Sequence, residues 1–333
     1  MGNERRMSTV YGPVLSWRLG RSLGIDVVPP PKTCTFDCVY CQLGRTLRKV
    51  SGFIEPQVRE DDVLRDVRRA LDLVDPNSID YVTFSGSGEP TLNPELGQMI
   101  QSVRQLTDKA VAVLTNSSLV GDERVRRSLA MADLVVAKLD APDQALFEVV
   151  NRPARGILHR SIVEGLAKLK GETTGELALQ IMFFESKGGG LTNAGREAIE
   201  ILIRLAEGIE PDEVQINTPT RPPSEKSVLA LEPDRVEAIA PRFRMSVKGA
   251  RIVSRYEERA RLAPRRLGHG KMEDEILSLI KRRPCGLEDI ATSLNLSSRV
   301  VAESLKELEE RRVVLKVRHG RKDYFRSSGK ELG

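Results

Sequence analysis

Short, almost continuously hydrophobic segments alternate with amphipathic segments from about residue 20 to residue 245. The hydrophobic segments are rich in β-branched residues, as buried parallel strands are. The amphipathic segments place hydrophobic residues at helical spacing, as Val63, Val67 and Leu71 do in one of them. The segments that we predict to be strands are Leu23–Val28, Asp80–Phe84, Ala110–Leu114, Leu134–Leu139, Leu177–Phe184 and Val214–Asn217.

Repeated strand–helix units predict an α/β fold with a parallel sheet. Six units are fewer than the eight of a complete TIM barrel, so we expect a partial (βα)6 barrel over residues 1–245. The active site of such a barrel lies at the carboxyl ends of its strands.

The pattern changes after residue 245. Residues 246–270 are rich in arginine and contain Gly249, Pro264 and Gly268, which predicts a linker. Residues 271–327 contain three helical patterns and then a hairpin, the order of a winged helix-turn-helix domain, and Ser297 or Ser298 is placed to cap the third helix. The helical patterns are Ile276–Ile280, Leu287–Leu294 and Val300–Leu308, and the hairpin strands are Val313–Val317 and Tyr324–Phe325, with His319 and Gly320 in the turn. We expect one of the two aromatic residues to pack in the core and the other to face a partner.

Composition and charge narrow the class of protein. The chain has 333 residues, 40% of them hydrophobic, which is enough for a large core. No run of about 18 apolar residues is present and the N-terminus lacks an apolar leader, so we expect a soluble, cytoplasmic protein that does not enter a membrane. The net charge of +5 is compatible with an anionic partner without requiring one.

Three of the four cysteines lie close together as C-x3-C-x2-C, directly after the first predicted strand. Soft thiolates bind zinc or iron–sulfur clusters, and structural zinc needs four protein ligands. A cubane held by three cysteines leaves one iron open to a small molecule. A zinc site that borrows a distant ligand is the alternative, and Cys285 is interpreted as a small, half-buried residue of the other domain. The three predicted cluster ligands are Cys34, Cys38 and Cys41, and the histidines of the chain are His159, His269 and His319.

This cysteine motif, with Tyr40 before its third cysteine, resembles the defining motif of the radical S-adenosylmethionine (SAM) superfamily. The resemblance implies an oxygen-sensitive 4Fe-4S cluster whose open iron chelates the amino and carboxylate groups of SAM. It also implies reductive cleavage of SAM to methionine and a 5′-deoxyadenosyl radical, and an electron donor such as ferredoxin or flavodoxin.

Further segments resemble motifs of the same superfamily. Gly86–Pro90 is similar to its Gly-Gly-Glu-Pro motif, in which Glu89 would accept a hydrogen bond from the SAM ammonium, and Thr115-Asn116 is similar to its Thr-Asn-Gly turn. Each is also compatible with an ordinary turn after a strand. Lys138 stands where many relatives have serine, and it either neutralises the SAM carboxylate or is a polar strand end. The residues predicted to contact the cofactor are Tyr40, Gly86, Ser87, Gly88, Glu89, Pro90, Asn116, Lys138, Asp140 and Asn217.

Two later loops belong to the same predicted face. Gly188–Gly190 are suited to a mobile gate and Arg221 to gripping an anionic substrate group, although plain loop chemistry explains both equally well. Residues 10–225 resemble an archaeal and bacterial group that is placed beside the wyosine-forming tRNA synthases. Those synthases have a second cluster held by further cysteines, which Cys285 alone cannot hold.

The predicted hairpin is strongly basic. Residues 311–326 contain seven Lys or Arg residues and one Asp, a net charge of +6, which suits phosphate contacts. Glu303 and Glu307 on the third helix oppose reading of a DNA groove, so nucleic acid binding, protein docking and a structural role all stay open for Arg311–Arg326. We therefore predict an enzyme that cleaves SAM and abstracts hydrogen from a macromolecular substrate, with RNA favoured. The alternatives are an activase or peptide-modifying enzyme that docks a partner protein, and an iron–sulfur DNA-binding regulator. No catalytic acid or base for the substrate is identifiable.

Overall fold

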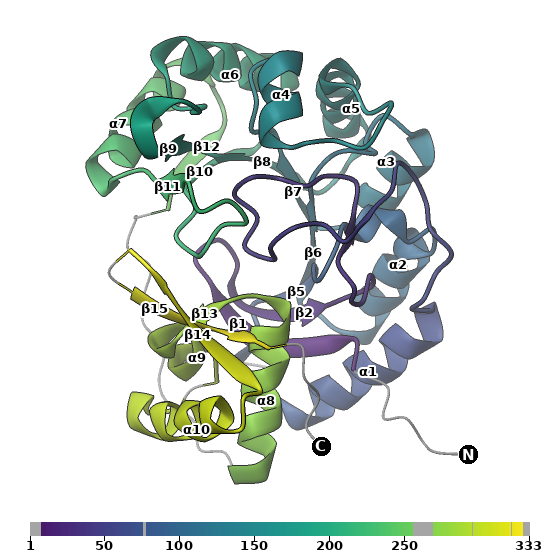
Figure 1. Ribbon diagram of the computed structural model, residues 1–333. Helices are drawn as coiled ribbons and strands as arrows, with labels where there is room; N and C mark the ends of the chain where they lie inside the picture. The colour runs from purple at the N-terminus through teal and green to yellow at the C-terminus, as the bar shows by residue number, and fades with distance from the viewer. Residues whose placement is uncertain (1–7, 76–77, 256–268, 295, 321, 329–333) are drawn as a thin grey trace.

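One curled, eight-stranded sheet forms the larger part of the molecule (Figure 1). The computed structural model describes residues 8–75, 78–255, 269–294, 296–320 and 322–328. The strand order is β1-β2-β5-β6-β7-β8-β10-β12, in which β1 and β2 are antiparallel and the other neighbours are parallel. The strands are β1 (Val10–Ser16), β2 (Gly20–Ile25), β5 (Tyr81–Phe84), β6 (Ala110–Thr115), β7 (Leu134–Lys138), β8 (Glu176–Met182), β10 (Glu213–Asn217) and β12 (Arg251–Ser254).

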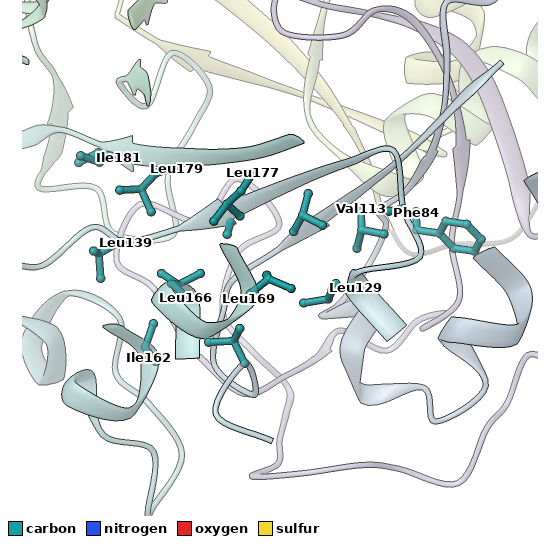
Figure 2. Close-up of a cluster of buried hydrophobic side chains, with 14 of the residues drawn as sticks. Phe84, Val113, Leu129, Leu139, Ile162, Leu166, Leu169, Leu177, Leu179 and Ile181 are labelled. Carbon is teal, nitrogen blue, oxygen red and sulfur yellow. The ribbon is translucent and has the colours of Figure 1, made fainter. Parts of the chain in front are cut away.

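Helices cover the outer, convex face of this sheet, which is the arrangement of a partial TIM barrel (Figure 1). Ile162, Leu166 and Leu169 lie on one face of α5 and pack towards Leu177 and Leu179 of β8 (Figure 2). The α/β class and the partial barrel are therefore confirmed. The helices are α1 (Glu60–Leu73), α2 (Leu96–Leu106), α3 (Glu123–Leu129), α4 (Gln144–Val150), α5 (His159–Glu172), α6 (Arg196–Ile209) and α7 (Pro233–Ser246).

The connections at the carboxyl ends of the strands contain short elements. They include two small two-stranded sheets and two single 3-10 turns. The first small sheet fixes the start of the cysteine loop. These elements are β3 (Thr33–Cys34) with β4 (Arg48–Lys49), β9 (Phe184–Ser186) with β11 (Val228–Ala230), η2 (Pro90–Leu92) and η3 (Lys187–Gly189).

All six predicted strands are present, and the sheet has two more at its edges. β1 contains Gly12 and Pro13, and its pairing with β2 shifts between Tyr11 and Val14, so its hydrophobic pattern does not alternate. β12 has four residues and lies in an arginine-rich stretch that the sequence had assigned to the linker of residues 246–270. The sheet thus continues past residue 245, while the division into domains stays a prediction. Residues 256–268 of that linker lie outside the described residues.

The C-terminal unit contains three helices and a three-stranded sheet of order β13-β15-β14. Ser297, which is one of the two predicted caps, is the N-cap of the last helix. Its side-chain oxygen accepts a hydrogen bond from Val300 N at 3.3 Å. The winged-helix assignment stays a prediction. The elements are α8 (His269–Arg282), β13 (Cys285–Gly286), α9 (Leu287–Leu294), α10 (Ser298–Glu310), β14 (Val314–His319) and β15 (Lys322–Ser327).

This unit packs against β1 of the barrel. Val14 of β1 belongs to the hydrophobic cluster of the C-terminal unit, and Leu15 N donates to Ser293 Oγ at 3.2 Å. Tyr324 and Phe325 are both buried, so the expectation that one faces a partner is wrong. Phe325 packs in the small core, whereas the Tyr324 hydroxyl donates to the Thr220 carbonyl of the barrel. The side chain that was expected to face a partner, Tyr324, therefore contacts the barrel of the same chain.

Within the described residues, no helix is long and apolar enough to cross a lipid bilayer.

Candidate functional site

A cavity of about 810 Å³ opens where the barrel strands end. This volume is near the upper end of the usual range for ligand pockets, about 300–1,000 Å³. Its wall includes Cys34, Cys38 and Cys41, so the three cysteines face one space. The cavity therefore brings together the three cysteines that the sequence predicted as cluster ligands.

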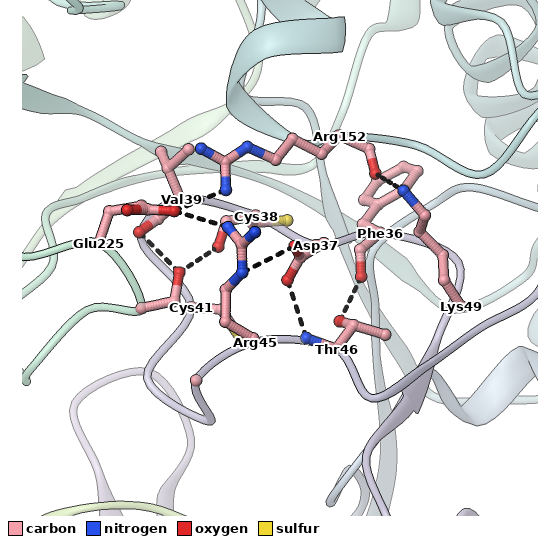
Figure 3. Close-up of polar contacts among 12 residues, drawn as sticks. Phe36, Asp37, Cys38, Val39, Cys41, Arg45, Thr46, Lys49, Arg152 and Glu225 are labelled. Carbon is pink, nitrogen blue, oxygen red and sulfur yellow. Dashed lines mark hydrogen bonds and ion pairs between the residues drawn. The ribbon is translucent and has the colours of Figure 1, made fainter.

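The cysteine loop is held by contacts with distant segments (Figure 3). Asp37 N and Val39 N donate to backbone carbonyls at the end of α4, both at 2.9 Å. Arg45 ion-pairs with Asp37 at 3.3 Å and with Glu225 at 2.6 Å, and Arg152 also reaches Glu225, at 2.7 Å. These contacts fix the loop before any cofactor binds.

Each cysteine sulfur has a nitrogen donor within reach. Lys32 Nζ lies 3.1 Å from Cys41 Sγ, and the side-chain amide of Asn151 lies 3.4 Å from Cys38 Sγ. The amide of Asn116 lies 3.3 Å from Cys34 Sγ. Donors of this kind stabilise negative charge on sulfur, as cluster ligands require.

Burial makes two of these thiols weak acids when nothing is bound to them. It raises the pKa of Cys34 to about 12, with Glu89 and Cys38 adding to the effect. It raises the pKa of Cys38 to about 11, with further contributions from Cys41 and Asp140. Iron binding would replace the thiol protons, because metal ligands are thiolates.

The donor set fits an iron–sulfur cluster. Among the described residues, no three His, Cys, Asp or Glu side chains lie close enough together to hold a single metal ion. All three thiols line one cavity, and thiolates are the ligands that iron–sulfur clusters use.

Glu89 is the buried carboxylate of this cavity. Its Oε1 accepts hydrogen bonds from the hydroxyls of Thr91 and Thr115, both at 2.7 Å, and its Oε2 accepts one from Asn116 N at 2.7 Å. Burial nevertheless raises its pKa, although these hydrogen bonds oppose that shift. A cationic group entering the cavity would therefore be attracted by a carboxylate that is already oriented.

Lys138 and Asp140 are joined to the cysteine loop through Tyr40. The Tyr40 hydroxyl donates to Asp140, and Lys138 Nζ lies 4.8 Å from the Tyr40 ring centroid and 3.3 Å from Asp140 Oδ1. Asp140 Oδ1 also accepts from Met182 N at 2.7 Å. Asp140 thus supports the cavity wall, while Lys138 reaches into the cavity.

The glycine-rich turn after β5 needs its glycines. A Cβ atom at Gly86 would lie 2.1 Å from Asp26 Cγ, and one at Gly88 would lie 2.1 Å from the Thr33 carbonyl oxygen. Ser87 is tied to Asp26, whose Oδ2 accepts from Ser87 Oγ at 2.8 Å and from Ser87 N at 3.1 Å. The turn is therefore pressed against the start of the cysteine loop.

The structure separates the predicted cofactor contacts into two groups. Ser87, Pro90 and Asp140 do not line the cavity, because their polar atoms or rings are used inside the protein, and we assign them a supporting role. The predicted contacts that line the cavity are Tyr40, Gly86, Gly88, Glu89, Asn116, Lys138 and Asn217.

Sequence reasoning did not identify three residues of this site. Lys32 precedes the first cysteine by two positions, and a cation so close to a thiolate motif was a usable signal. Asn151 and Asp26 carried no such signal, because only the folded chain brings Asn151 to Cys38 and Asp26 to Ser87.

Known proteins resemble parts of this chain. The sequence profile of the radical SAM superfamily matches residues 28–185. The chain is 41% identical over 215 residues to a UPF0026 protein of Synechocystis sp., which covers 64% of this chain and 76% of that protein. It is 33% identical over 308 residues to a Brachyspira hyodysenteriae protein named GTPase Obg, covering 92% of this chain but 43% of that protein. Among solved structures, a radical SAM methyltransferase from Sphaerobacter thermophilus matches with a TM-score of 0.49 and 18% identity, over 70% of this chain and 65% of that one.

Proposed function

This chain belongs to the radical SAM superfamily, among the UPF0026 proteins, and we propose that it is a SAM-cleaving enzyme that modifies a macromolecular substrate, with RNA favoured. The cofactors of the superfamily are a 4Fe-4S cluster and SAM. When bound, they supply a 5′-deoxyadenosyl radical, which takes a hydrogen atom from the substrate.

One observation carries the proposal: three thiols and an oriented buried carboxylate line the same cavity. Cys34, Cys38 and Cys41 would hold the cluster. Glu89 would accept hydrogen bonds from the SAM ammonium, and Lys138 would lie near its carboxylate. The remaining cavity wall would orient the substrate and exclude water.

The basic hairpin favours a nucleic acid as the substrate. β14 presents Lys316 and Arg318 with side chains that are 50% and 70% exposed. Tyr324 of β15 also contacts Thr220, which lines the cavity, so the hairpin stands beside the site. A phosphate backbone held by the hairpin would therefore pass close to the cavity.

Anaerobic reconstitution tests the central step. The wild-type protein should bind about four irons and, with a chemical reductant and SAM, release 5′-deoxyadenosine. Cys34→Ala should lose both properties, because the cluster needs all three thiolates. Cys285→Ala is the matched control, since Cys285 lies in β13 within the C-terminal core, and it should retain both. Wild-type protein with a complete cluster that releases no 5′-deoxyadenosine would contradict the proposal, and stoichiometric zinc in place of iron would favour the zinc alternative.

A further inference from the structure

Part of the cavity wall carries four arginines from four separate segments. Arg18 lies in the turn between β1 and β2, Arg221 in the loop after β10, Arg255 directly after β12, and Arg283 directly after α8. We refer to these four residues as the seam arginines. All four line the cavity that also contains the cysteines.

The fold brings them together at the open side of the barrel. β1 and β12 are the two edges of the sheet, and Arg18 and Arg255 follow these edges. The C-terminal unit lies beside β1 (Figure 1) and supplies Arg283. Its Tyr324 contact with Thr220 lies next to Arg221 in the chain. The seam is thus formed by both sheet edges and the C-terminal unit together.

One indole ring organises two of these cations. The guanidinium carbons of Arg18 and Arg255 lie 5.8 Å and 5.7 Å from the centroid of Trp17. Cation–π contact supports positive charge where water is partly excluded. Trp17 therefore holds two guanidinium groups near each other instead of letting them separate.

One acid that lines the cavity lies beside the seam, at Arg221. Of the acidic residues that line the cavity in the described structure, Asp80 is paired with Arg21 at 2.6 Å and Glu89 is held by threonine hydroxyls. Asp289 is the acid next to the seam, and it lies 3.4 Å from Arg221 Nη2.

Two further observations show the cost of burying these cations close together. Arg221 Nε is buried without a hydrogen-bond partner among the described residues. Burial lowers the pKa of Arg18 to about 10, and the neighbouring charges of Arg283, Arg221 and Arg255 add to that shift. An anion bound between these guanidinium groups would reduce their mutual repulsion.

The charged residues near the seam differ from those near the cysteines. The charged neighbours that act on the thiols are Lys32, Glu89 and Asp140, whereas those that act on Arg18 are the other seam arginines and Glu213. Glu213 is itself ion-paired with Arg251 at 2.6 Å. The seam is therefore a different part of the cavity wall from the cysteine loop.

We propose that the seam arginines form a binding site for a phosphoryl group of the substrate. The inference rests on the proposed function, since it names the chemical class of the molecule that enters the same cavity. Guanidinium groups bind phosphate oxygens in pairs, and a phosphoryl group would offer acceptor oxygens to several seam arginines at once. The adjacent basic hairpin would hold further phosphates of the same molecule.

The test is calorimetric titration of the full-length, cluster-reconstituted protein with inorganic phosphate, in the presence of saturating SAM and at constant ionic strength. Wild-type protein should bind phosphate, and Arg221→Gln and Arg283→Gln should each weaken binding at least about tenfold, equivalent to about 1.4 kcal/mol. Arg160→Gln is the matched control: Arg160 is exposed on α5 and paired with Glu164, and its loss should leave phosphate affinity unchanged. Iron content and thermal unfolding establish that each variant is folded. If a Gln variant does not fold, Arg→Lys at the same position is used instead. Lysine keeps the positive charge but lacks the planar guanidinium group that binds two oxygens, so it should still weaken phosphate binding.

Three outcomes would overturn the inference: no phosphate binding by the wild type, equal affinity in the seam variants and the control, or tighter binding of succinate, a carboxylate dianion, than of phosphate. None of these measurements depends on SAM cleavage. A protein that binds phosphate at the seam but releases no 5′-deoxyadenosine refutes the proposed function. A protein that releases 5′-deoxyadenosine but binds no phosphate at the seam refutes the phosphoryl site alone.

Discussion

At the scale of residues, the cysteine loop combines ligands that are close in sequence with donors that are not. Cys34 and Cys38 each receive a side-chain amide, from Asn116 and Asn151 respectively. Hydrogen bonds to cluster sulfurs are one of the factors that set the reduction potential of a cluster. These two asparagines are therefore candidates for tuning the ease with which the cluster is reduced.

The raised pKa of Cys34 predicts how the iron-free protein reacts with iodoacetamide. Only the thiolate reacts, and at pH values far below a pKa of about 12 the thiolate fraction grows about tenfold per pH unit. A thiol with a pKa of about 8.5 gains only about threefold between pH 8 and pH 9. Peptide mass spectrometry should therefore show about a tenfold rise in the alkylation rate of Cys34 over this interval.

The control is the same peptide alkylated in denaturant, where the ordinary threefold dependence should return. If the alkylation rate of Cys34 in the folded, iron-free protein also rose only about threefold, burial would not raise the pKa of this thiol.

The sequence predicted the residues whose roles depend on local spacing. Three cysteines within eight positions and Glu89 in a glycine-rich turn are recognisable without any structure. Asn151 supports the site only because the loop after α4 returns to the cysteine loop, a contact between positions 113 residues apart. Tertiary contacts of this kind have no periodic or spacing signal.

At the scale of elements, the end of α8 is connected to the glycine-rich turn through one buried ion pair. Arg282 Nε lies 3.8 Å from Asp26 Oδ2, both side chains are 3% exposed, and the same carboxylate oxygen binds Ser87. Arg282 also lies over the Tyr11 ring, at 4.4 Å from its centroid. The C-terminal unit thus contacts the turn that carries Glu89 through a single intermediate side chain.

Replacing Arg282 should destabilise the protein in a pH-dependent way. Arg282→Met would leave the Asp26 carboxylate buried without its cation, which costs about 3–5 kcal/mol in buried pairs. Burial already raises the pKa of Asp26 while Arg282 opposes the shift, so removing Arg282 raises that pKa further. The loss of unfolding free energy should accordingly be larger at pH 8 than at pH 5, as measured by urea unfolding.

A double-mutant cycle provides the control for this prediction. Asp26→Asn combined with Arg282→Met should lose much less than the sum of the single losses, because no unpaired charge stays buried. Additive losses would show that the two residues do not interact.

The strands of the sheet differed in how readily they could be predicted. β5 to β8 and β10 are largely buried on both faces, and β6 and β7 therefore appear as nearly continuous hydrophobic runs. β12 is an edge strand of four residues that starts with an exposed arginine, and β1 has a register shift next to Pro13. Edge strands satisfy fewer packing constraints, so their sequences carry a weaker signal.

At the scale of the whole molecule, the barrel and the C-terminal unit share the site. Arg283 and Asp289 of the C-terminal unit line the same cavity as the cysteines of the barrel. The basic hairpin lies beside this shared cavity, where Tyr324 contacts Thr220. A substrate that carries several phosphates would therefore contact both parts at once.

The hairpin predicts a salt-dependent affinity for RNA. Removing two phosphate contacts with Arg318→Gln/Lys322→Gln should reduce the slope of log K against log salt by about 1.4, since each contact to a single strand contributes about 0.7. The measurement is fluorescence anisotropy of single-stranded RNA with the full-length protein over a range of salt concentrations. Arg299→Gln on α10, whose side chain is 89% exposed, should leave the slope unchanged. Equal slopes in all three proteins would exclude the hairpin as the RNA contact.

The contact between β1 and the C-terminal unit has a consequence for solubility. An edge strand presents unpaired backbone groups that invite another chain to add to the sheet, which is a route to aggregation. Here Ser293 accepts the Leu15 amide, Arg282 Nη2 donates to the Ser8 carbonyl at 2.8 Å, and α8 covers Val14. A fragment that ends after β12 would retain the complete sheet but expose this edge and its apolar side chains. The C-terminal unit therefore protects the barrel from self-association, whatever else it binds.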